Sequence, residues 1–249
     1  ACWSKRRGPE MAGEDDGMEQ VSRGEFVHAR LRDAIKAGRY PPGTRVRETE
    51  VAAWLNVSRT PVREALRRLQ ADGLLVFEPW RGVVVAELDQ QQIVEFYAMR
   101  RVLDGAAARL AAQHASEPEL AYMEDCLTAA APSRGDADLM AEANRKFHDA
   151  LFQAAHNRYL LKSAAALSDA LALLRGTTYS FPDRAETAHQ EHRALMDAIR
   201  AREPDKAERL ARKHIAKAEK ARLKLLGDQR EERQSEDKAA KGKDAKDKS

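Results

Sequence analysis

The sequence predicts a mainly α-helical protein in which an N-terminal winged helix-turn-helix domain precedes an all-helical bundle. Three observations predict this fold class. The 249 residues suffice for two ordinary domains with hydrophobic cores. Residues 21–86 combine three helical patterns with two short β-prone runs, whereas residues 89–226 show helical patterns and no strand-like alternation. A charged content of 33% and a hydrophobic content of 43% fit helices with one buried and one solvated face.

Both ends of the chain are expected to lie outside these two domains. Residues 1–20 are polar, contain glycine and show no periodicity, so we expect a disordered N-terminal arm. Residues 228–249 carry seven acidic and seven basic side chains and no aromatic one, which is typical of a disordered, charged tail. Between the domains, Glu87-Leu88-Asp89 is the expected hinge.

The first two helices of residues 21–86 are predicted from apolar spacing and from the turn between them. One helix ends at Gly38, and its apolar face consists of Phe26, Ala29, Leu31 and Ile35. The Tyr-Pro-Pro-Gly sequence at 40–43 predicts a turn. A short helix over 48–55 follows, with an apolar side of Val51, Trp54 and Leu55.

The third helix, within 56–73, is the most informative segment of the chain. Ser58 is a good N-cap, Pro61 falls in the first turn where its missing N–H costs little, and Gly73 is a natural stop. One face is apolar, formed by Val62, Ala65, Leu66 and Leu69. A second face carries Thr60 and a stripe of Arg59, Arg63 and Arg67. Such side chains are long enough to reach phosphates and base edges in a DNA groove.

A two-stranded wing is predicted directly after the third helix. The β-prone runs 74–77 and 83–85 flank a hairpin tip at 78–82. Arg81 and Gly82 at that tip can lay a guanidinium and an open backbone against phosphates or the minor groove. The charge of this domain agrees, because residues 21–86 contain 12 Lys/Arg against 7 Asp/Glu.

Other classes of protein are disfavoured by composition. The two cysteines, Cys2 and Cys126, are far apart and lack metal-like spacing, so no disulfide framework is expected. The sequence has no run of 18 apolar residues and no signal-peptide core, which favours a cytoplasmic protein without a membrane partner.

Residues 89–226 predict about six helices. Paired residues typical of a capping box occur at Asp89 with Gln92 and at Ser116 with Glu119. Further helix starts are marked by Asp136, Asn157 and Pro204, and breaks by Gly135, Gly176 and Pro182. An all-α bundle is the simplest packing for this pattern.

Three of these helices carry polar residues on their apolar stripes. Asn144 and His148 are four residues apart on one helix, and His192 and His214 lie on two others. If these four side chains converge inside the bundle, they would form a site for a divalent metal ion. Zinc is the expected ion, with nickel or manganese as alternatives. His189 competes with His192, since it lies one turn earlier on nearly the same face. The alternative from spacing alone is three unrelated core histidines, each hydrogen-bonded to a neighbour.

Arg100 also continues an apolar stripe, and an inward-facing arginine needs an anion. Asp104, four residues later, can supply it within the helix. Alternatively, Arg100 binds the carboxylate of a small organic acid through a bidentate pair.

The segment 56–73, with R-E-T-E-V-A before it and F-E-P-W-R-G-V-V-V after it, resembles the GntR superfamily of bacterial transcription regulators. The second domain resembles the FCD branch, named for the C-terminal domain of the fatty-acid regulator. The residues that carry this second resemblance lie in 97–112, 144–157, 191–199 and 207–215.

This resemblance implies roles for individual residues. The family reads DNA with the first turns of the third helix and the wing tip, which here correspond to Ser58, Arg59, Thr60, Pro61, Arg63, Arg81 and Gly82. Many FCD members hold a divalent metal with an Asp or Asn and three histidines, which match Asn144, His148, His192 and His214. Asn144 removes the negative charge that Asp would supply, so weaker metal retention is expected.

The resulting hypothesis is a homodimeric repressor that binds an inverted-repeat operator in double-stranded DNA. A small carboxylic acid would bind at Arg100 and the metal and release the protein from DNA. A metal-dependent hydrolase, a direct metal sensor and an architectural DNA binder are the alternatives. The sequence offers no obvious general base, nucleophile elbow or phosphate loop, which disfavours an enzyme.

Overall fold

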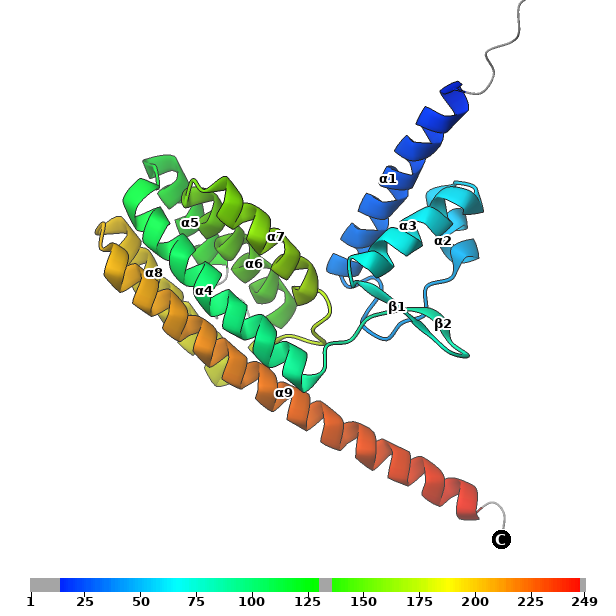
Figure 1. The fold of residues 1–249 in the computed structure, drawn as a ribbon. Coiled ribbons are helices and arrows are strands. Elements are labelled where there is room, and N and C mark those ends of the chain that lie inside the picture. Colours follow the sequence, from blue (N-terminus) through cyan, green and yellow to red (C-terminus); the bar gives the residue numbers. More distant parts are fainter. Residues whose placement is uncertain (1–13, 130–135, 247–249) are drawn as a thin grey trace, which may run out of the picture. The chain divides into compact units, whose positions relative to one another are not determined.

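A computed structural model describes residues 14–129 and 136–246 of the chain, and it confirms the predicted mainly α-helical architecture with one small hairpin (Figure 1). The chain divides into two compact units, with the main boundary between Glu87 and Leu88 and with residues 171–173 grouped with the first unit. The N-terminal unit contains α1 (Glu14–Lys36), α2 (Glu48–Leu55), α3 (Arg59–Ala71), β1 (Leu75–Glu78) and β2 (Gly82–Val85). The C-terminal unit contains α4 (Gln90–His114), α5 (Glu117–Ala129), α6 (Ala137–Ala154), α7 (Arg158–Leu171), the 3₁₀ turn η2 (Thr178–Ser180), α8 (Pro182–Arg200) and α9 (Pro204–Lys246).

The helix α3 lies on the rest of the N-terminal unit by the apolar face that its spacing predicts. Val62, Ala65, Leu66 and Leu69 are all buried, and α1 packs along the same helix. Ser58 occupies the N-cap position with extended backbone, although its side chain makes no capping hydrogen bond. Gly73 follows the helix at φ +77°, the left-handed conformation that glycine adopts without strain.

The wing is an antiparallel hairpin directly after α3. Its register pairs Leu75 with Val85 and Glu78 with Gly82, so the connecting tip consists of three residues, Pro79, Trp80 and Arg81. Arg45, in the segment before α2, adds an isolated bridge to Val84 and ties that segment to the hairpin.

In the C-terminal unit, α4 and α9 run alongside each other, and α6 and α8 also pack against α4 (Figure 1). Their shared core contains fully buried large side chains, among them Phe147, Leu151, Leu195 and Met196. The capping box at the start of α4 forms as predicted, because Asp89 Oδ1 accepts from the Gln92 amide at 2.8 Å and Gln92 Oε1 accepts from the Asp89 amide at 2.9 Å.

The two expected disordered ends differ from the structure. Helix α1 begins at Glu14, so residues 14–20 are helical, and the acidic residues of this first turn are favourable at a helix N-terminus. Helix α9 continues through residues 228–246, where Lys, Arg, Glu and Ala are frequent and proline is absent. The prediction gave too much weight to charge and too little to helix propensity. Residues 1–13 and 247–249 of these ends lie outside the described residues.

Candidate nucleic-acid interface and metal centre

The first turns of α3 present two arginines that share one carboxylate. Arg59 Nη2 and Nε donate to Glu48 Oε2 at 2.9 and 3.3 Å. Arg63 Nε donates to Glu48 Oε1 and its Nη2 to Oε2, both at 3.0 Å. Both arginine side chains remain more than half exposed, whereas Glu48, at the start of α2, is partly covered. The carboxylate therefore holds two cations side by side on an open surface.

The charge of Glu48 is strongly favoured by this arrangement. Hydrogen bonds from Arg63 and then Arg59 lower the pKa of its carboxyl from 4.5 to about 2. Glu48 is thus ionised at any physiological pH. Sequence patterns did not single it out, because nothing in the spacing of α2 shows that its first residue faces the first turns of α3.

The remaining residues of the predicted DNA-reading set are placed in three different ways. Ser58 and Thr60 are exposed beside Arg59 at the start of α3. Pro61 is buried, so it shapes the helix start rather than presenting a surface. Arg81 is turned back onto its own domain, where Nη1 donates to Glu78 Oε2 and Nη2 to the carbonyl of Gly43, each at 2.6 Å. Gly82 follows it at φ +81°.

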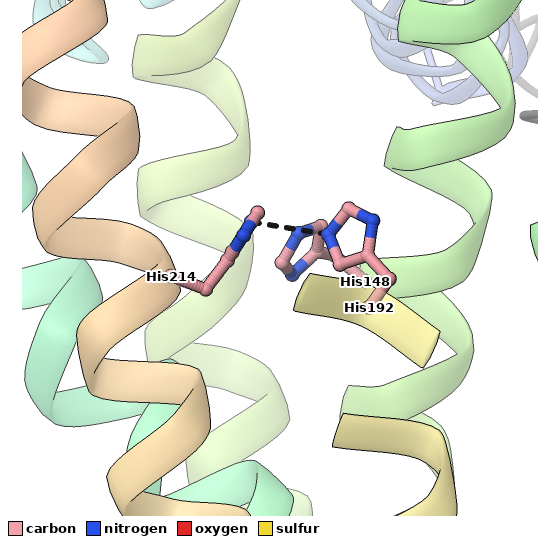
Figure 2. A group of neighbouring side chains, drawn as sticks. All are labelled: His148, His192 and His214. Carbon is pink, nitrogen blue, oxygen red and sulfur yellow. Dashed lines mark hydrogen bonds between the residues drawn. The ribbon is translucent and has the colours of Figure 1, made fainter. Parts of the chain in front are cut away.

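The three histidines predicted as ligands do converge in the bundle. His148 comes from α6, His192 from α8 and His214 from α9, and their rings face one another (Figure 2). One nitrogen of each lies within 4.8 Å of the others, and His192 Nε2 is 3.1 Å from His214 Nε2. The three residues are only 7%, 1% and 4% exposed. His189 does not belong to this group, so the geometry favours His192 over its rival.

Two of these rings have a carboxylate close to their Nδ1 atom. Glu191 Oε2 lies 2.8 Å from His214 Nδ1 in a hydrogen bond. Asp104 Oδ1 lies 2.8 Å from His148 Nδ1, in a contact that is short but poorly aligned for a hydrogen bond. Histidines that bind metals usually use the second ring nitrogen in this way, which fixes the orientation of the ring.

The chemistry of the cluster fits a divalent metal. Burial lowers the pKa of His192 well below 6.5, and it lowers the pKa of His214 to about 4 despite the opposing effect of Glu191. Both rings are therefore neutral near pH 7, as metal coordination requires. The Oδ1 atom of Asn144 is buried without a hydrogen-bond partner among the described residues. A cation beside it would satisfy this otherwise unfavourable atom.

Arg100 is linked to the histidine cluster through Asp104, which contacts both Arg100 and His148. Its Nη2 and Nε donate to Asp104 at 3.0 and 3.3 Å, and both side chains are almost completely buried. Burial alone would raise the pKa of the Asp104 carboxyl, but Arg100 and His148 hold it well below its usual range. The structure thus contains the intrahelical pair that was one of the two interpretations of Arg100, and this pair uses Nε and Nη2 of the guanidinium.

A surface pocket of about 420 Å³ lies elsewhere in the bundle, on the outside of α5 and α6. Its lining includes Tyr122, Lys146 and Asp149 and none of the predicted metal or effector residues. It carries two carboxylates, Glu119 and Asp149, which makes it a poor site for an anionic effector.

Comparisons with known proteins agree with this architecture. Residues 23–85 match the model of the gntR family of bacterial regulatory proteins, and residues 95–217 match the FCD domain. The probable D-xylose utilization operon transcriptional repressor of Paenarthrobacter nicotinovorans is 36% identical over 197 residues, which cover 76% of this chain and 86% of that protein. The chain belongs to the GntR family. The predicted family, including its FCD branch, is therefore confirmed.

Other members of the GntR family show the same relation. An uncharacterized helix-turn-helix transcriptional regulator of Bacillus subtilis, YdhC, is 32% identical over 188 residues, or 74% of this chain and 84% of that protein. The crystal structure of a GntR transcriptional regulator from Rhodococcus sp. RHA1 superposes with a TM-score of 0.68 at 27% identity, covering 81% of this chain and 98% of the other. The relatives are thus named as regulators or repressors of transcription. Within the described part of this chain, no helix is long and apolar enough to cross a membrane.

Proposed function

We propose that this chain is a DNA-binding repressor of transcription, which a small carboxylic acid releases from its operator. The observation that carries the proposal is the pair of exposed arginines held by Glu48 at the start of α3. An arginine fixed in orientation can bond a guanine edge through two parallel donors. The family of the chain supports the same function, since its relatives are named as transcription regulators.

The DNA contacts divide into base reading and positioning. Arg59, next to the N-cap, is the candidate for guanine in the major groove, and Ser58 and Thr60 flank it. Arg63, one turn later, is the candidate for a phosphate clamp. Two copies related by a two-fold axis would place two such helices on an inverted repeat, as expected for a homodimer.

The metal would be held by Asn144, His148, His192 and His214, with Asp104 and Glu191 orienting two of the rings. When bound, a zinc, nickel or manganese ion supplies an electrophilic centre that attracts carboxylate oxygens. Arg100 Nη1 is the candidate for the carboxylate of the effector. Arg184 is a second cation in this region, since it pairs with Glu191 at 3.0 Å and its Nε is buried without a hydrogen-bond partner among the described residues.

The DNA-reading role is tested by Arg59→Ala. We select a preferred duplex from a random-sequence library with the wild-type chain and measure its dissociation constant by fluorescence anisotropy. Loss of a bidentate contact to a base should weaken binding by about tenfold or more, at a cost of about 1–3 kcal/mol. Arg68→Ala is the matched control, because Arg68 lies on the same helix but faces Glu25 of α1. Equal affinities for Arg59→Ala and the wild type would contradict the assignment.

The metal site is tested by three histidine variants. His148→Ala and His192→Ala should lower the metal bound per chain after exposure to zinc and dialysis, as measured by atomic emission. His189→Ala, one turn from His192 on α8, should retain it, because His189 lies outside the cluster. Full occupancy in His148→Ala, or loss only in His189→Ala, would refute the ligand set.

A direct metal sensor is the second candidate, because the same buried cluster would support it. The two functions differ in one measurement. If the ion is the signal, operator affinity changes with free zinc and without any organic acid. If the acid is the signal, zinc-loaded protein binds the operator and releases it only when the acid is added.

A further inference from the structure

The tip of the wing carries an aromatic side chain that folding of the domain does not explain. Trp80 is completely exposed, at 101% of its reference surface, and its backbone has φ +69°. This left-handed conformation is unfavourable for a bulky residue. Phe77 on the same hairpin is 68% exposed. A large apolar group held in water on a strained turn indicates a surface that binds something.

Arg81, the next residue of the tip, turns its side chain back onto the domain. Its guanidinium joins Glu78 on one side and the Gly43 carbonyl on the other, so it braces the hairpin against the segment before α2. With Arg81 engaged in this way, Trp80 is the tip residue whose side chain is left to meet a partner.

A cation lies close to the wing tip, next to Gly82. Arg45 is exposed, and its Nη2 and Nε lie 3.7 Å from the position that a Cβ on Gly82 would occupy. No ion pair of Arg45 is found among residues 14–129 and 136–246. The wing tip therefore combines an exposed indole with an exposed guanidinium that has no ion pair among the described residues. This combination is complementary to a partner that carries negative charge and offers an apolar surface to the indole.

We propose that Trp80 is a DNA contact, with its indole against the minor groove of the operator and Arg45 on a flanking phosphate. This inference rests on the proposed function. Apolar side chains on wing-like elements enter the minor groove between sugars and base steps. The indole N–H adds a donor for the acceptors that A·T pairs present there. The basic excess of the domain and the position of the wing next to α3 favour duplex DNA over a protein partner.

The test measures how far DNA shields Trp80. Acrylamide, an uncharged quencher, is titrated into wild type and Trp80→Phe, each free and bound to the selected duplex. Trp3 and Trp54 remain in both proteins, so the difference between them isolates the emission of Trp80. We expect the quenching constant of that component to fall on DNA, because a groove contact would cover the indole that is fully exposed in the free protein.

Affinity provides the second measurement. Trp80→Ala should raise the dissociation constant of the selected duplex about tenfold, and Trp80→Phe should recover most of the affinity. Tyr159→Ala is the matched control, because it removes another exposed aromatic side chain, 76% exposed on α7 of the other unit. Its affinity should equal that of the wild type.

Three outcomes overturn the inference and can be told apart. If the duplex binds but Trp80 stays fully quenchable and Trp80→Ala binds normally, the wing tip is not a contact and the proposed function stands. If no duplex is selected at all, both proposals fail. If Trp80 becomes shielded without DNA as protein concentration rises, the tip is a surface for self-association.

Discussion

At the scale of single residues, Glu48 orients the two exposed arginines of α3 that we propose as DNA contacts. A carboxylate next to a DNA interface repels phosphates. This unfavourable effect must be offset by the orientation that the carboxylate gives to the two arginines. Here it fixes both guanidinium planes at once, and the pKa of about 2 shows that it does so over the whole physiological range. The pair of arginines is thereby oriented before DNA arrives, which lowers the conformational entropy lost on binding.

The substitution Glu48→Gln removes this charge. We expect binding to random duplex to strengthen and its salt dependence to steepen by about one unit of log–log slope, because a freed arginine can take another phosphate. Preference for the selected duplex should fall. Anisotropy titrations at several salt concentrations measure both. Glu50→Gln is the control, because Glu50 lies on the same helix as Glu48 but pairs with Arg47 instead of the arginines of α3. An unchanged specificity ratio would contradict the role assigned to Glu48.

At the proposed metal site, the candidate ligands and the carboxylates next to them could not be predicted equally well from the sequence. His148, His192 and His214 could be predicted, because each interrupts an apolar stripe and the resemblance supplies their order. The contact of Asp104 with His148 and that of Glu191 with His214 could not be predicted. They depend on how α4, α6, α8 and α9 rotate against one another, and periodicity does not contain that information.

At the scale of elements, local signals set the helix starts more reliably than the helix ends. Ser58 and Asp89 marked the starts of α3 and α4, where caps act within a few residues. The end of α9 was missed because charge alone was read as disorder, whereas the residues after 226 also favour helix. The exposure of Trp80 could not be predicted either, because spacing does not show which side chains of a hairpin tip turn back onto the domain, as Arg81 does.

The start of α5 gives a prediction with a defined pH dependence. A hydrogen bond from the Ser116 amide, followed by contacts to the Ser116 hydroxyl and His156, lowers the pKa of Glu119 from 4.5 to about 2. Because the folded pKa is the lower one, the stabilising effect is present above pH 4.5 and is lost as the pH falls through about 2.

Glu119→Gln should therefore lower the melting temperature of the helical domain by roughly 2–4 °C at pH 7. The difference from the wild type should shrink as both are acidified toward about pH 2, where Glu119 becomes protonated. Thermal unfolding followed by circular dichroism measures this. Glu117→Gln, at the first position of the same helix, should have little effect because Glu117 is almost fully exposed. A difference that stays constant with pH would contradict the account.

At the scale of the whole molecule, the proposed repressor must pass a signal from the bundle to α3. The two units join at Glu87–Leu88, directly before the capping box that fixes Asp89 at the start of α4. An effector can change operator affinity only by preferring one arrangement of the units, and such couplings are typically about 1–3 kcal/mol. By reciprocity, the operator should weaken effector binding by the same factor.

Insertion of three glycines after Leu88 should break this coupling. We expect the variant to bind zinc and the acid as the wild type does, because the bundle is unchanged. Operator binding should persist at reduced affinity, while the response to the acid, identified by thermal-shift screening of zinc-loaded protein, should disappear. Calorimetry and anisotropy on the same preparations separate these properties. A full response in the variant would show that the signal does not travel through this junction.

The proposed function requires that the Arg59–Arg63 face of α3 reads a specific DNA sequence as part of a two-fold dimer. Hydroxyl-radical footprinting of the selected duplex at moderate salt tests it most directly. We predict two protected patches, related by a two-fold axis and about one helical turn apart, which vanish for Arg59→Ala and persist for Arg68→Ala. Uniform protection, or an identical footprint with Arg59→Ala, would contradict it.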